Sequence, residues 1–196
     1  MTKTSADNLM KSFINGDEES FVALYNRFKK PIFLYLLSLL RSEAQAEEIT
    51  HDTFLKIFLK KDQYNAEYAF STWAWAIARN AAMDKLRKKD PLALTAQSQS
   101  DELEHQYDQQ EDIEIILTDK SNREALHKAI EALPTMQREI ISLRLFSDLE
   151  LKEIAQVTKK KLSSIKSSLY RAQQSLEIKL KEGQEKRENK NEEELI

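Results

Sequence analysis

Apolar residues recur every three or four positions along most of the chain, which is the spacing that puts them on one face of an α-helix. Phe21, Leu24, Tyr25 and Phe28 form such a face. A ten-residue apolar run follows at 31–40, and Pro31 at its beginning predicts the start of a separate, central helix of a bundle. The alternative for this run is a helix on a membrane surface, although its polar face is small for that role.

Further helices are predicted on both sides of this run. Asp7 is expected to cap the first helix, and the break at Gly16 and Asp17 precedes the second. A third helix is expected over about residues 44–60 and a fourth over residues 70–89. In the third, the inward positions are Ile49, Thr53, Phe54 and Ile57, while Glu47, Glu48, His51, Asp52, Leu55 and Lys56 lie on outer faces.

The stretch 131–172 has the pattern of a helix-turn-helix. Pro134 ends one helix and starts the next, a polar break follows at 147–148, and a short helix begins near Leu151. After Lys159, Lys160 and Lys161, apolar residues return at spacings of three and four from Leu162 to Leu176. The outward side of this last helix is basic and hydroxyl-bearing, which suits a DNA major groove. The alternative is a three-helix bundle whose lysines are simply solvated.

Composition narrows the class of protein. Two glycines and three prolines in 196 residues indicate long helices and few turns, so we expect an all-α fold. The absence of cysteine excludes disulfides and thiolate zinc sites, and we expect neither a metal nor a cofactor. No phosphate-binding glycine loop or catalytic histidine cluster is present, which argues against an enzyme. The longest apolar run is too short to cross a bilayer and the N-terminus lacks a secretory signal, so a cytoplasmic protein is expected.

Charge is distributed in blocks. Residues 1–88 carry 13 Lys and Arg against 11 Asp and Glu, and residues 120–182 carry 13 against eight. Between them, residues 89–119 carry one lysine against nine acidic residues. A DNA-binding surface is judged by local clustering, so the net charge of −3 does not exclude nucleic acid as a ligand.

The fourth predicted helix, 70–89, carries Trp73 and Trp75 on different faces. Asn80, Asp84 and Arg87 share one face of it, where Asp84 can orient Arg87. Exposed aromatic rings beside a basic helix are typical of sites for unstacked, single-stranded DNA. The alternative is that both tryptophans belong to the core and that Asp84 and Arg87 form a surface ion pair.

Three segments in this order resemble the sigma-70 family of bacterial transcription initiation factors, in particular its small extracytoplasmic-function group. AEEITHDTFLKIF (46–58) is similar to the family's core-polymerase-binding helix, and 70–89 to its promoter-melting and minus-ten-recognition helix. The segment 132–176 resembles the minus-thirty-five-binding domain. The resemblance implies domain 2 at 5–90, an acidic flexible linker at 91–119, domain 4 at 120–182 and a disordered charged tail at 183–196.

The resemblance also implies functional residues. Core polymerase would contact Glu48, Asp52, Phe54 and Ile57, although the family commonly has glutamine where this chain has His51. The minus-ten element would be met by Tyr64, Asn65 and Tyr68 of a base-capturing loop and by Trp73, Trp75, Arg79, Asn80, Asp84, Arg87 and Lys88. The minus-thirty-five element would be met by Arg138, Arg144, Lys161, Ser163, Ser164, Lys166, Ser167, Tyr170 and Arg171.

One position departs from the family pattern. The family usually has glycine in the turn of the helix-turn-helix, where this chain has Lys159 and Lys160. Either the turn has another geometry, or the register slips so that Leu162 fills a core position. A lysine with positive φ would be strained. The three lysines of this turn would then offset the strain with phosphate contacts, which is a hypothesis.

The implied partners are bacterial core RNA polymerase, promoter DNA and, as is frequent in the family, an anti-sigma factor that is often membrane-anchored. The acidic linker is expected to shield the basic faces, so deleting 97–112 should raise the affinity of the free protein for DNA. Two other functions stay open. One is a free-standing helix-turn-helix regulator that binds duplex DNA through 132–176, and the other is a helical adaptor that binds protein.

Overall fold

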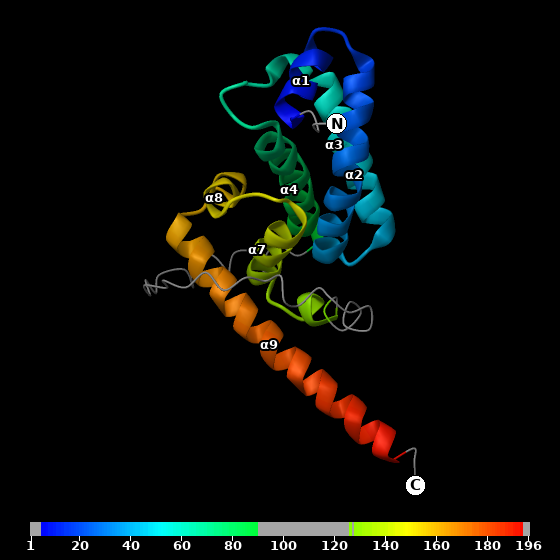
Figure 1. The fold of residues 1–196 in the computed structure, drawn as a ribbon, viewed down its shortest axis with the longest axis vertical. Helices are drawn as coiled ribbons and strands as arrows, with labels where there is room; N and C mark the ends of the chain where they lie inside the picture. Colours follow the sequence, from blue (N-terminus) through cyan, green and yellow to red (C-terminus); the bar gives the residue numbers. More distant parts are fainter. Residues whose placement is uncertain (1–4, 90–125, 127, 194–196) are drawn as a thin grey trace.

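The computed structural model describes residues 5–89, 126 and 128–193, with side chains up to residue 181. All regular elements among these residues are helical, which confirms the all-α prediction (Figure 1). The first half comprises α1 (Ala6–Ile14), α2 (Glu18–Leu40), α3 (Glu43–Leu59), the 3-10 turn η1 (Lys61–Gln63) and α4 (Phe70–Lys89). The second half comprises α7 (Thr135–Phe146), α8 (Leu151–Thr158) and α9 (Leu162–Glu193). The whole of the predicted linker, 91–119, lies outside the described residues.

The helix α2 runs without interruption through Pro31, so the prediction of a new helix there was wrong. Leu24 and Phe28 before the proline and Ile32 and Leu36 after it are all buried. Because these residues continue one apolar stripe at spacings of four, packing of the whole face outweighs the single helical hydrogen bond that proline cannot donate.

The first helices are capped by side chains close to their first turns. Ser5, and not Asp7 as predicted, caps α1, because its Oγ accepts the N–H of Asn8 at 3.2 Å. Asp17, in the predicted break before α2, caps this helix by accepting the N–H of Glu19 at 3.1 Å and the hydroxyl of Ser20 at 2.6 Å. The Ser20 hydroxyl lowers the pKa of the Asp17 carboxyl below its ordinary value.

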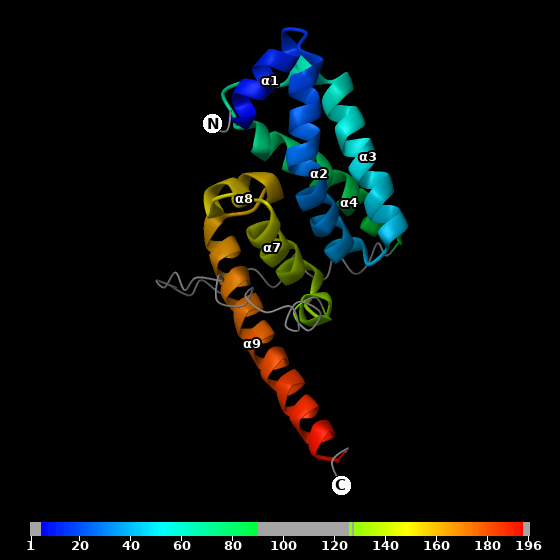
Figure 2. The same ribbon diagram turned by 45° about the vertical axis from the view of Figure 1, so that its right-hand side comes forward.

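A single apolar core extends across both halves of the chain. Tyr35 of α2 and Trp75 of α4 are fully buried in the same cluster as Ile140 of α7, Ile154 of α8 and Ile165 of α9. In Figure 2, α7 and α8 lie against the side of the bundle formed by α2 and α4. A smaller cluster within the second half brings together Leu126, Ala129, Ile130, Leu133, Ile141, Ala172 and Leu176.

The last helix, α9, continues to Glu193 and extends away from the other helices (Figures 1 and 2). The sequence predicted a disordered tail from residue 183, whereas the backbone of residues 183–193 is helical. The segment is rich in Glu, Lys, Arg and Gln, which are good helix formers, and Gly183 alone does not end the helix. None of the helices in the described part of the chain is long and apolar enough to span a membrane.

Candidate nucleic-acid and protein interfaces

The turn between α8 and α9 forms with a lysine in the left-handed region. Lys159 has φ 57° and ψ 38°. Its N–H donates to Gln156 O at 3.2 Å, and the Lys160 N–H donates to Ala155 O at 3.0 Å, which is the Schellman pattern of a helix C-terminus. Leu162 is only half-buried, so the register does not slip to bring it into the core. The turn therefore keeps the usual helix-turn-helix geometry at the cost of strain in Lys159.

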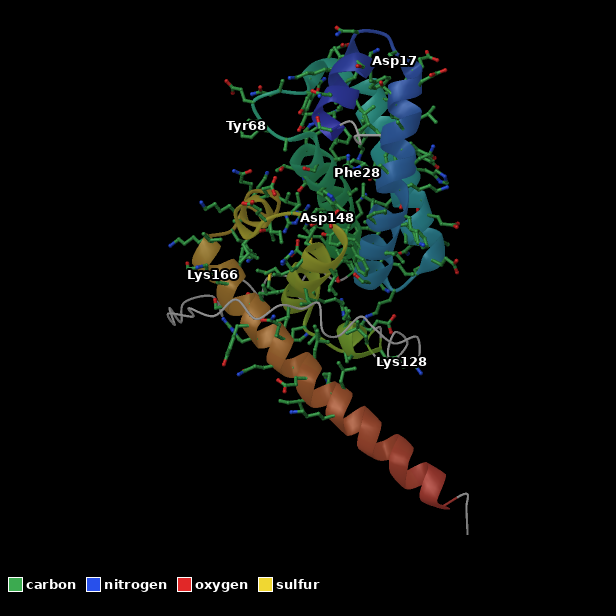
Figure 3. The ribbon with its side chains drawn as sticks, in the orientation of Figure 1. Asp17, Phe28, Tyr68, Lys128, Asp148 and Lys166 are labelled. Carbon is green, nitrogen blue, oxygen red and sulfur yellow. The ribbon has the colours of Figure 1, made fainter. Side chains whose placement is uncertain are left out.

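The first turns of α9 expose part of the predicted DNA-reading set. Lys161, Ser163, Lys166 and Tyr170 are exposed, and Lys166 lies near the start of α9 (Figure 3). Ser164 and Arg171 are half-buried. Ser167 is buried and its Oγ donates to Ser163 O at 2.9 Å, so in this structure the side chain is used within the helix.

Arg138 does not lie on the DNA-facing surface. It is buried, and its Nη1 donates to the carbonyl oxygens of Glu131 and Leu133 at 2.8 and 3.2 Å. Burial and the neighbouring Arg41 lower the pKa of Arg138 to about 10. In this structure Arg138 binds carbonyls just before Pro134 and is not presented for the predicted phosphate contact. Arg144, the other predicted phosphate ligand of α7, is half-buried.

The two tryptophans of α4 have different environments. Trp75, which was predicted to contact DNA, is instead fully buried in this structure, with its ring edge-on to Tyr35 at 5.4 Å. Trp73 is half-buried and its ring centroid lies 5.4 Å from that of Tyr64. At the other end of the helix, Asn80 and Lys88 are exposed, and Arg87 and Asp84 form the predicted surface ion pair.

The loop between η1 and α4 is folded around Tyr64. This side chain is buried and its hydroxyl donates to Tyr68 O at 2.7 Å. In this structure the ring is therefore not available for the contact with a minus-ten base that was predicted for it. Burial and the nearby Asp7 raise the pKa of Tyr64 to about 12, which keeps the hydroxyl protonated. Asn65 and Tyr68 are exposed, and Figure 3 shows Tyr68 on the loop at the edge of the molecule.

The outer face of α3 carries a mixed acidic and apolar surface. Glu48 and Asp52 are exposed as predicted, and Glu48 pairs with Lys85 of α4 at 3.0 Å. Phe54 and Ile57, which were predicted to contact polymerase, are instead buried in the core and are not presented on this face in this structure. The exposed apolar residues of α3 are instead Leu55, Phe58 and Leu59.

Sequence reasoning left these three residues out of the candidate site. Helical periodicity had put Leu55 on an outer face, and an apolar residue on a polar face is the signal that would have identified it.

The two halves of the chain meet through polar contacts inside an apolar interface. Arg79 of α4 donates its Nε to Glu139 of α7 at 2.6 Å, and the two side chains are 15% and 3% exposed. Burial alone would lower the pKa of Arg79, but the Glu139 carboxylate raises it above its ordinary value. Ser38 of α2 donates to Ser142 of α7 at 2.8 Å within the same buried region.

Arg79, predicted to meet DNA, is thus bound to the other half of the protein. Glu139 was not predicted as a functional residue. The sequence feature that could have identified it is its position, because it is an acidic residue directly before the inward-facing Ile140. No group of His, Asp or Glu that could hold a metal ion occurs in the described ranges.

Comparison with known proteins gives two matches to family descriptions. Residues 24–91 match sigma-70 region 2, and residues 123–176 match sigma-70 region 4. The first covers most of α2 to α4, and the second contains the helix-turn-helix.

Individual relatives agree with these matches. The extracytoplasmic-function (ECF) RNA polymerase sigma factor SigW of Bacillus subtilis is 26% identical over 181 residues, which cover 88% of this chain and 95% of SigW. The RNA polymerase sigma-H factor of Pseudomonas aeruginosa is 22% identical over 182 residues, covering 90% and 94%.

Solved structures show the same fold. CnrH in complex with the cytosolic domain of CnrY has a TM-score of 0.65 at 18% identity, covering 91% of this chain and 98% of that one. The sigma factor RpoE in complex with the anti-sigma factor NepR from Bartonella quintana has a TM-score of 0.64 at 22% identity, covering 83% and 98%. The order of the two matched regions and the helices that carry them lead to one conclusion: the chain belongs to the sigma-70 family, as a sigma factor of the extracytoplasmic-function group.

Proposed function

We propose that this protein binds bacterial core RNA polymerase, directs it to a two-part promoter and helps to open the DNA, without covalent chemistry of its own. The observation that carries the proposal is the combination, in one chain, of a helix-turn-helix with an exposed basic helix and a separate loop and helix with exposed polar and aromatic groups. A regulator that binds only duplex DNA, or a protein-binding adaptor, has no use for the second site. Such a sigma factor works in the cytoplasm, where the polymerase is.

The outer face of α3 is the surface we assign to core polymerase. Glu48 and Asp52 supply negative charge, and Leu55, Phe58 and Leu59 supply exposed apolar area beside it. Clustered apolar residues with a charged rim are typical of protein interfaces. This assignment keeps the two acidic residues expected from the family resemblance and replaces the buried Phe54 and Ile57 with their exposed neighbours.

The start of α9 is the surface we assign to the minus-thirty-five element. Lys166 and Tyr170 face outward from its first turns, and the exposed Lys159 and Lys161 flank the preceding turn. A recognition helix contacts base edges through its N-terminal residues, while nearby lysines contact phosphates. Ser167 and Arg138 are left out of this surface because both are buried.

The loop 64–69 and the exposed side of α4 are assigned to the minus-ten element. Asn65 carries a donor and an acceptor, both of which bond Glu67 at 3.0 Å in this structure and would be exchanged for a base. Tyr68, which is 56% exposed, offers a ring on which an unpaired base can stack. Asn80 and Lys88 continue this surface along α4.

The structure corresponds, in this proposal, to a closed form of the protein. Arg79 is bound to Glu139, and α7 and α8 cover part of α4, so the two halves must separate before Arg79 can reach DNA. CnrH and RpoE were solved in complex with CnrY and NepR. We infer that this chain has an anti-sigma partner of the same class, which favours the closed form.

Reconstitution with bacterial core polymerase on a promoter library tests the function. We expect stable binding to core polymerase and transcription that starts from a specific class of promoters. Leu55→Asp should abolish core binding, since it puts a charge into the apolar surface. Ile178→Asp is the matched control, because Ile178 of α9 is 59% exposed and Leu55 is 56% exposed. The absence of both core binding and specific transcription by the unchanged protein would refute the proposal.

A further inference from the structure

The carboxylate of Asp7 is bound to a segment more than fifty residues further along the chain. Its Oδ1 accepts the backbone N–H of Phe70 at 2.6 Å and the hydroxyl of Tyr64 at 3.3 Å. Asp7 is not needed as the cap of its own helix, because Ser5 has that role. The side chain therefore joins α1 to the loop and to the first residue of α4.

The N-terminus of α4 needs such a partner. Ala69 precedes the helix and its carbonyl accepts the first helical N–H, from Trp73 at 3.3 Å. An alanine side chain has no oxygen that can accept the free N–H groups of the first turn. Asp7 supplies this acceptor from α1, with a negative charge that is favourable at the N-terminal end of the helix dipole.

The same carboxylate also holds the loop. The Tyr64 hydroxyl lies between Asp7 Oδ1 and Tyr68 O, while its ring packs against Phe70 and Trp73. In η1, just before the loop, Lys61 Nζ lies 4.7 Å from the centre of the Phe13 ring and donates to Phe13 O at 3.4 Å. The segments on both sides of the loop, η1 and the start of α4, are thus attached to α1.

We propose that α1 is a brace for the loop 64–69, and that Asp7 is a positioning residue for promoter opening. This inference rests on the proposed function, in which Asn65 and Tyr68 meet the unpaired minus-ten bases. Asp7 touches no DNA itself. It holds the Tyr64 side chain and the first residue of α4 in place. It thereby fixes the positions of the exposed side chains between them when a base leaves the duplex.

The test compares two aspartate caps within one half of the chain. Asp7→Ala removes the contact with the loop, and Asp17→Ala removes the cap of α2, which does not touch the loop. Asp7→Asn keeps an acceptor oxygen at the same position. Holoenzymes reconstituted with each full-length variant are mixed with duplex promoter DNA carrying a fluorescent adenine analogue in the minus-ten element, and affinity for core polymerase and melting temperature are measured alongside.

We expect both alanine variants to lower the melting temperature by about 2–4 °C and to leave core binding unchanged. Only Asp7→Ala should reduce the amount of open complex, by about fivefold to tenfold, the factor that corresponds to loss of one cap. Asp7→Asn should stay within about twofold of the unchanged protein. If Asp7→Ala does not fold, Tyr64→Phe replaces it: it removes the hydroxyl that contacts both Asp7 and Tyr68 O but leaves the bond from the Phe70 N–H to Asp7, so it should give a smaller loss in the same assay.

Equal opening by Asp7→Ala and Asp17→Ala, or a defect in Asp7→Asn as large as that in Asp7→Ala, would overturn the proposal. Amide hydrogen exchange separates this failure from that of the proposed function. The brace predicts faster exchange over residues 64–73 in Asp7→Ala and not in Asp17→Ala, whether or not the protein opens DNA. If exchange follows this pattern but the unchanged protein opens no promoter, the proposed function fails and the brace remains. Unaltered exchange in Asp7→Ala removes the brace.

Discussion

Breaking the ion pair between Arg79 and Glu139 should open the protein. We consider Glu139→Gln, which keeps the size of the side chain and removes its charge. Glu139 is 3% exposed and lies 2.6 Å from Arg79, so the change leaves a guanidinium facing a neutral amide inside the interface. Removing one partner of a buried pair costs about 3–5 kcal/mol.

For Glu139→Gln we expect the closed form to lose stabilising free energy at the lower end of that range, about 3 kcal/mol. The reason is that Arg79 is not fully buried and can reach water when the halves separate. A change of about 3 kcal/mol shifts an equilibrium between closed and open forms by roughly 150-fold. Unless the closed form is favoured by much more than this, the open form becomes a visible fraction of the molecules.

The distance between the halves can be measured directly, because the chain has no cysteine and two introduced cysteines are unique labelling sites. Exposed positions Lys56 of α3 and Lys179 of α9 suit spin labels or dyes. We expect one narrow distance distribution for the unchanged protein and an added, longer component for Glu139→Gln. Glu48→Gln is the control, since its pair with Lys85 is exposed and lies within the first half.

A distance distribution in Glu139→Gln identical to that of the unchanged protein, together with the full loss of stability, would refute the reasoning. It would mean that the apolar contacts keep the halves together without the ion pair.

Arg138→Ala should destabilise the second half by about 2 kcal/mol in urea unfolding and leave the salt dependence of promoter binding unchanged, whereas Lys166→Ala should lower the salt slope by about 1. Lys159→Gly should stabilise the protein by about 1 kcal/mol, seen as a higher melting temperature, because glycine adopts positive φ without strain; no rise would count against the left-handed turn. Ser20→Ala should raise the pKa of Asp17 in an NMR titration. The ionised Asp17 stabilises the fold above the ordinary pKa of aspartate, and this stabilisation is lost as the pH falls through the lowered pKa of Asp17. Because that pKa should be higher in Ser20→Ala, the variant should lose the stabilisation at a higher pH.

The helices themselves were predictable because their apolar spacing is regular. The helices near 44–60 and 70–89, and the starts of α7, α8 and α9 in the described part of the second half, lie close to the predicted positions, whereas α9 continues well beyond its predicted end. The error at Pro31 arose because a local rule about proline was given more weight than the apolar stripe that continues through it. Proline excludes one hydrogen bond, while the stripe buries a whole face of a 23-residue helix.

The candidate site was predicted less well, because the sequence does not reveal which polar or aromatic residues are buried by distant segments. Trp75 and Arg138 carry side chains typical of DNA contacts, yet one lies in the core and the other binds carbonyls near Pro134. Asp7 was expected to cap its own helix, α1, and instead accepts the backbone N–H of Phe70 at the start of α4. These differences arise from contacts between residues far apart in sequence, which helical periodicity does not report.

The shared core has a consequence for how this molecule behaves as a folding unit. Although two family regions are matched separately, Tyr35 and Trp75 on one side and Ile140 and Ile154 on the other belong to one buried cluster. In the closed form the two regions should therefore melt together, in one cooperative transition and not in two. Each region expressed alone would present to water the apolar face that the other now covers, so the isolated halves should be less soluble than the intact chain.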